Sequence, residues 1–110
     1  MSRFDTLRPA KTKAQAAREE LAELIALTDE DWISTAPGLR AENFAGRIIF
    51  NMNRIDSDLA DKLFDMSSVI YNDSERAMVE AGLSSQRRYT LQQREHALVC
   101  YQVARDYLTK

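Results

Sequence analysis

The side chains best suited to metal chemistry are His96 and Cys100, which stand four residues apart. On a helix this spacing puts both on one face, where they could share a metal ion. A zinc site needs three or four ligands, and the chain has no second histidine or cysteine, so only added carboxylates or a second subunit would complete one. We therefore interpret Cys100 as a small buried thiol and His96 as a partly exposed imidazole, and we expect no metal and no cofactor.

A second candidate is a group of aspartates within DSDLADKLFD. Asp58, Asp61 and Asp65 fall on one helical face, opposite the apolar residues of the same stretch, and such carboxylates can hold Mg²⁺ or Ca²⁺. The glycine of a calcium-binding loop is absent, and Lys62 and Arg54 lie within reach of the acids. We interpret them as a solvated face.

The sequence gives hydrolytic chemistry little support. It has one histidine, no nucleophile-elbow pattern and no glycine-rich phosphate loop, and nothing in it favours a paired-carboxylate mechanism. We therefore expect a protein that is not an enzyme.

The stretch LSSQRRYTLQQRE, residues 83–95, offers a different chemistry. Arg87, Arg88 and Arg94 could contact phosphates, and Tyr89 could stack on a base. As a helix-turn-helix the stretch fits poorly, because Arg88 falls where the second helix should present an apolar residue. Two interpretations stay open: a solvated connection before the last helix, or a contact with a macromolecule.

Charge is distributed unevenly along the chain. Residues 1–13, with Arg3 and Arg8, carry four basic side chains against one acid, and residues 83–110 carry five against two, whereas the middle has six against fourteen. The basic ends could steer an anionic partner, or they could fold against the acidic middle.

The elements that position these residues are predicted to be helices. A chain of 110 residues with three glycines and two prolines suits one helical domain, residues 1–110, with a polar arm at 1–10. A single cysteine allows no disulfide within the chain, and no signal peptide or long apolar run is present, so we expect a cytoplasmic protein.

Apolar spacing and capping residues predict helices at 11–27, 29–35 and 74–81, and a last helix from Thr90. Thr28 should cap the second helix, residues 72–74 should form a turn, and Gly82 should end the helix at 74–81. Trp32, the only tryptophan, either covers one end of the core or anchors a partner.

Residues 41–71 form the longest apolar stripe, with steps of three and four throughout. One unbroken helix would be about 46 Å long, longer than the diameter of about 34 Å of a domain this size. The helix therefore either breaks near 53–58 or extends beyond its domain, where a second copy would cover it. We favour the continuous helix, which predicts a homodimer or a long helical hairpin. The predicted partner or dimer interface consists of Trp32, Phe44, Ile48, Met52, Ile55 and Leu59.

The predicted fold is all-α, a small bundle of four to six helices with one long or kinked central helix at about 41–71. The predicted function is a small regulator, inhibitor or adaptor that acts through protein–protein contacts of its helix surfaces, as a homodimer. The alternative is a nucleic-acid-binding regulator that uses the basic turn at 84–94 and the basic N-terminal arm.

Overall fold

The computed structural model describes residues 11–110, which form five helices and no strand. The helices are α2 (Lys13–Ala26), α3 (Glu30–Thr35), α4 (Gly38–Asn53), α5 (Ser57–Glu80) and α6 (Ser85–Leu108). The predicted all-α bundle is therefore confirmed.

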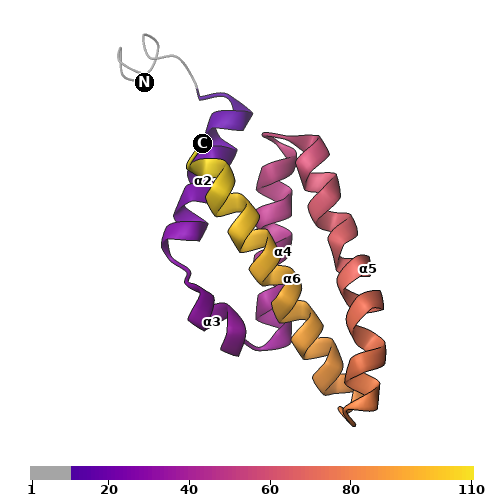
Figure 1. The fold of residues 1–110 in the computed structure, drawn as a ribbon. Coiled ribbons are helices and arrows are strands. Elements are labelled where there is room, and N and C mark those ends of the chain that lie inside the picture. Colours follow the sequence, from indigo (N-terminus) through magenta and orange to yellow (C-terminus); the bar gives the residue numbers. More distant parts are fainter. Residues whose placement is uncertain (1–10) are drawn as a thin grey trace, which may run out of the picture.

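The last helix, α6, is the centre of the bundle. All four other helices pack on it, and α4 also packs on α2 and α5 (Figure 1). The core contains fully buried side chains from α2, α3, α4 and α6, including Leu21, Ile33, Ile48, Met52 and Cys100. The broad apolar face of the last helix accounts for its central position.

Capping residues set the first two helix starts close to the predicted positions. Thr12 accepts from the Gln15 backbone while the Gln15 side chain accepts from the Thr12 backbone, so α2 begins with a capping box. The cap of α3 is Asp29, which accepts from Trp32 N at 2.7 Å, and the prediction that Thr28 is the cap is wrong.

The preference for one continuous helix over 41–71 is wrong. The helix stops at Asn53, and the chain reverses through Arg54 and Ile55 to Asp56, whose side chain accepts from Leu59 N at 3.1 Å and caps α5. The break lies within the region named as the alternative, 53–58. The apolar stripe keeps its phase across the turn, since α4 and α5 each turn their stripe towards α6.

The predicted turn at 72–74 and the separate helix after it are also wrong, because α5 runs unbroken to Glu80. Ser74 does not cap a helix: its hydroxyl donates to Ile70 O at 2.7 Å, one turn back in the same helix. The end at Gly82 is confirmed. Its φ of 79° lies in the left-handed region that favours glycine.

The last helix begins five residues earlier than the predicted Thr90. Ser84 caps it by accepting from Arg87 N at 3.3 Å. Thr90 donates to Gln86 O, and the Gln93 side chain donates to Glu42 of α4, so these two residues do not form the predicted capping box.

The long apolar stripe is covered by its own chain. Phe44, Ile48 and Met52 are buried in the core, and Ile55 and Leu59 are partly buried against it. These side chains are therefore core residues, and the stripe does not need a second copy to cover it. The homodimer stays a prediction, but the length of the stripe no longer supports it.

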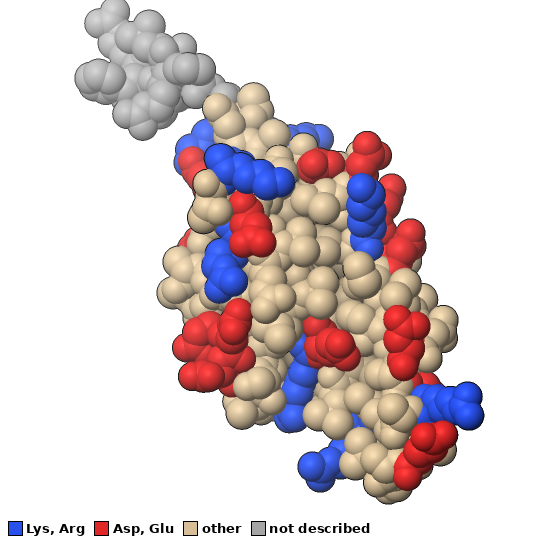
Figure 2. All heavy atoms as spheres, viewed as in Figure 1, with Lys and Arg blue, Asp and Glu red and all other residues tan. Residues whose placement is uncertain are grey.

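Charged side chains of both signs are mixed on the face drawn in Figure 2. Lys and Arg atoms lie among Asp and Glu atoms over the whole view, so this face carries no continuous basic surface.

Candidate partner-binding site

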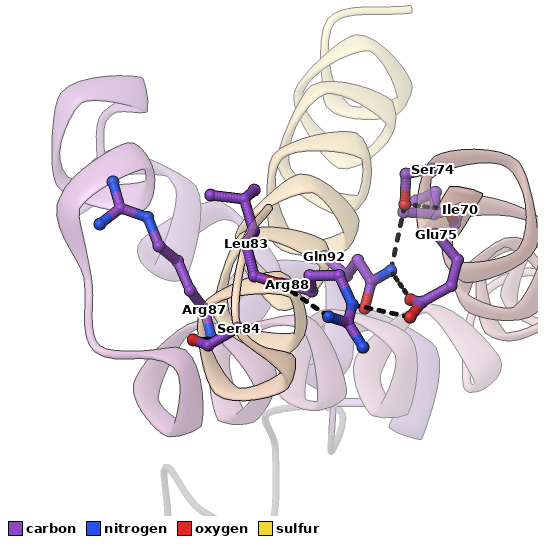
Figure 3. A network of polar contacts seen from close by, with 8 residues as sticks. All are labelled: Ile70, Ser74, Glu75, Leu83, Ser84, Arg87, Arg88 and Gln92. Carbon is purple, nitrogen blue, oxygen red and sulfur yellow. Dashed lines mark hydrogen bonds and ion pairs between the residues drawn. The ribbon is translucent and has the colours of Figure 1, made fainter. Parts of the chain in front are cut away.

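The predicted basic turn at 84–94 is wrong, because residues 85–94 are the start of α6, and two of its arginines hold the bundle together. Arg88 Nε donates to Glu75 Oε1 at 2.8 Å, and its Nη1 donates to Leu83 O at 2.7 Å, so it ties α5 to the turn before α6. Gln92 joins the network by donating to the other oxygen of Glu75 at 2.8 Å (Figure 3). These hydrogen bonds lower the pKa of the Glu75 carboxyl, Gln92 having the larger effect and Arg88 the next.

Arg94 is also held by its own chain. Its Nε donates to Ala36 O at 2.7 Å, which satisfies a carbonyl just after α3 and fixes that short helix on α6. Of the predicted nucleic-acid residues this leaves Arg87, whose side chain points away from the Arg88–Glu75 network (Figure 3), and Tyr89. Arg3 and Arg8 lie outside the described residues.

Tyr89 faces a different side of α6 and packs edge-on against Tyr71, with 5.7 Å between ring centroids. Arg87 and Arg94 line one hollow on α6, whereas Arg88 and Tyr89 are turned towards α5, so the four predicted residues do not all share one surface. The nucleic-acid alternative stays a prediction, with Arg88 and Arg94 already engaged.

His96 and Cys100 lie together but form no metal-ligating cluster. His96 Nε2 donates to Leu63 O at 2.7 Å, which fixes the tautomer, and lies 3.6 Å from Cys100 Sγ. No group of three His, Cys, Asp or Glu residues that could hold a metal occurs within 11–110. Burial raises the pKa of the Cys100 thiol to about 12, so this sulfur is a poor nucleophile at neutral pH.

A groove between α4 and α5, closed at its base by α6, lies beside Tyr71, Tyr89 and His96. It has a volume of about 320 Å³, and we call it the α4–α5 groove. Its lining consists of Glu42, Ala45, Gly46 and Ile49 from α4, Phe64, Ser67 and Tyr71 from α5, and Tyr89, Gln93 and His96 from α6. Phe64 stands on its wall with 67% of its surface exposed.

One end of this groove is polar. Glu42 accepts from Gln93 Nε2 at 2.7 Å, and Tyr71 lies beside Tyr89. Burial, followed by the effects of Tyr89 and Glu42, raises the pKa of Tyr71 to about 12, so its hydroxyl stays protonated. Glu42 is the only carboxylate in the lining.

Gly46 is the unusual residue of the groove. It lies in the middle of α4, and a Cβ placed on it would meet nothing within 4 Å. It also lines a second, shallower hollow between α2 and α4, together with Glu42 and Phe50. Gly46 thus lies on the surface of α4 between two hollows and, having no side chain, leaves the helix backbone uncovered there.

The sequence interpretation missed Gly46, Phe64 and Glu42 as a group, because they come from two helices whose reversal it did not favour. One signal was present: Gly46 is the only glycine in the stretch 41–71. Asn51 was also missed. It is a polar residue on the apolar stripe and is 1% exposed, and its Oδ1 has no hydrogen-bond partner among the described residues.

Comparison with known proteins found no matching family model, no similar curated protein and no similar solved structure. Within residues 11–110, none of the helices combines the length and the apolar character that crossing a membrane requires.

Proposed function

We propose that this protein is a non-catalytic regulator or adaptor that binds a helix of a protein partner in the α4–α5 groove. The observation that carries the proposal is the groove itself: an apolar hollow with an exposed phenylalanine on one wall and an unfilled glycine on the other.

Gly46 supports contact with another molecule. Glycine inside a helix destabilises it by about 1 kcal/mol relative to alanine. Within residues 11–110 no neighbouring atom lies within 4 Å of a Cβ placed at this position, so alanine is not excluded there. A partner that lies directly on α4 supplies a reason for glycine there, because the missing side chain allows close approach of the two backbones.

The shape and charge of the groove favour a basic, amphipathic helix as the occupant. A hollow bordered by two helices suits a third helix, which buries apolar residues spaced three and four apart. Ile49 and Phe64 supply apolar walls, while Glu42 supplies negative charge. A lysine or arginine at the edge of the partner's apolar face matches this acid and speeds association.

Site-specific photo-cross-linking in the native host tests the proposal. Benzoylphenylalanine replaces Phe64 in one variant and Val69 in another. Val69 is also exposed, at 48%, but points about 140° away around the same helix. We expect a protein adduct from position 64 and not from position 69.

A blocking variant completes the experiment. Gly46→Leu in the position-64 variant fills the space above Gly46 and should abolish the adduct. Thermal unfolding should stay unchanged or move to higher temperature, because leucine has the higher helix propensity and a Cβ at this position meets nothing within 4 Å. The proposal is refuted if position 64 gives no adduct, if position 69 gives the same adduct, or if the adduct has twice the mass of the chain, which identifies a second copy.

A further inference from the structure

We infer that a second hollow, on the side of α4 towards α2 and α3, binds a monocarboxylate with an apolar body, the chemistry of a medium-chain fatty acid. This inference is independent of the helix-binding proposal. The hollow lies between the end of α2, the short α3 and the first half of α4 and has a volume of about 330 Å³. We call it the Trp32 hollow.

Aromatic and aliphatic side chains form the apolar part of the Trp32 hollow. Trp32 is 38% exposed and meets Phe44 edge-on, with 5.8 Å between ring centroids and 70° between ring planes. Leu24 and Leu27 of the α2 end complete this surface, and Leu27 is 80% exposed. A ligand in the hollow would therefore remove both Trp32 and Leu27 from water, which is the main source of affinity for an apolar body.

The charges of the hollow are both positive. Arg40 and Arg47 line it, and no carboxylate does, although the whole chain has a net charge of −2. Arg47 is partly engaged, since its Nη2 lies 3.4 Å from Glu20 Oε1. Arg40 is exposed and has no hydrogen-bond or ion-pair partner within residues 11–110.

These two features together specify the ligand. A free guanidinium presents paired donors that match the two oxygens of a carboxylate. Arg40 lies one turn of α4 from Phe44, so a carboxylate on Arg40 would place an attached apolar chain over Phe44 and Trp32. A cationic ligand meets two guanidiniums, and a neutral hydroxyl can accept one hydrogen bond from Arg40 but gains no ionic attraction. The hollow is at the small end of the range of ligand pockets, which favours a small amphiphile.

Trp32 provides a direct measurement, because it is the only tryptophan of the chain. The full-length protein is titrated with octanoate, octanol and octylammonium below their micellar concentrations, and the tryptophan emission is recorded. These probes share a tail and differ in head group. We expect octanoate to shift the emission to shorter wavelength with an affinity roughly five- to tenfold above that of octanol, which reflects one partly exposed charge-assisted interaction, and octylammonium to bind most weakly.

Two variants separate the head group from the tail. Arg40→Gln should bring octanoate down to the affinity of octanol. The matched control Arg87→Gln removes an exposed arginine near the N-terminal end of α6 and should change the affinity for neither octanoate nor octanol. Leu27→Ser should weaken octanoate and octanol by the same factor. Equal affinity of the wild-type protein for octanoate and octanol, an unchanged octanoate affinity in Arg40→Gln, or the absence of any saturable emission change overturns the inference.

Discussion

Gly38→Ala is the substitution that tests most directly how α4 is seated on α6. Gly38 is the first residue of α4, and a Cβ there would overlap Gln93 Oε1 and lie 3.2 Å from Gln93 Cδ and 3.3 Å from Thr90 Oγ1. A free glutamine side chain would move aside. Gln93, however, is 5% exposed, and its Nε2 donates to Glu42 at 2.7 Å. Moving it breaks that hydrogen bond inside the bundle.

The expected effect is a net destabilisation of about 2 kcal/mol. Overpacking costs about 1–3 kcal/mol, and losing a hydrogen bond to a charged group adds about 1.5–3 kcal/mol if it is not remade. Relaxation of the side chain reduces both, and the higher helix propensity of alanine offsets less than about 1 kcal/mol. Thermal unfolding followed by circular dichroism should show a Tm lower by roughly 8–12 °C.

Gly46→Ala is the matched control, since it makes the same change in the same helix where a Cβ meets nothing within 4 Å. It should raise the stability by about 1 kcal/mol. A double-mutant cycle with Gln93→Ala then tests the cause: removing the Gln93 side chain should be less harmful with alanine at position 38 than with glycine there. A Tm for Gly38→Ala equal to that of the wild type, or strictly additive effects in the cycle, would refute this account.

Three further predictions concern the α5–α6 network and the buried thiol. Arg88→Gln should destabilise the fold by about 1–2 kcal/mol in chemical denaturation, because it loses its contacts with Glu75 and Leu83, whereas Arg87→Gln should stay within about 0.5 kcal/mol. In the folded protein the pKa of Glu75 lies below its ordinary value of 4.5. The charged carboxylate therefore stabilises the fold above pH 4.5, and this stabilisation is lost as the pH falls through the lowered pKa of the folded state. Glu75→Gln should remove this part of the pH dependence, so stability should fall less steeply with pH on the acid side. Cys100, fully buried and with its pKa raised to about 12, should not react with Ellman's reagent in the native protein and should react completely in denaturant; rapid native reaction contradicts its burial.

Helix content and several helix ends could be predicted from the sequence, because they depend on local signals. The predicted helices at 11–27 and 29–35 end within about two residues of α2 and α3, and Gly82 adopts the conformation that glycine alone adopts easily. The capping residues were predicted less well. The capping boxes expected at Thr28 and Thr90 are wrong, and the one that the structure has, at Thr12 and Gln15, was not predicted.

The wrong helix bounds arose where contacts with residues distant in the sequence determine the local structure. The turn at residues 54–56 keeps the apolar stripe in phase, so the pattern alone did not distinguish a reversal from a continuous rod. What decides is that α4 and α5 both have α6 to pack on. Ser74 resembled a cap, but within α5 its hydroxyl donates to Ile70 and accepts from Gln92 of α6, eighteen residues on.

The same limit applies to the candidate site. Arg94 resembled a phosphate contact, and its partner, Ala36 O, is 58 residues away in the sequence. Phe64 and Gly46 lie on one surface because α5 packs antiparallel beside α4, and the sequence pattern did not predict that packing. Residue types alone therefore predicted Tyr89, which lines this groove, but not Gly46 and Phe64 beside it.

The nucleic-acid hypothesis and the groove hypothesis differ in which internal contacts of the fold must break on binding. To contact a phosphate, Arg88 must release Glu75 and Leu83 O, and at 20% exposure of its side chain that pair is the least exposed ion pair among residues 11–110. Such a contact would oppose the stability of the α5–α6 connection. Phe64 and Gly46 give up no internal hydrogen bond when a partner covers them, and covering them removes apolar surface from water. On this comparison the α4–α5 groove is the surface where binding and folding do not compete.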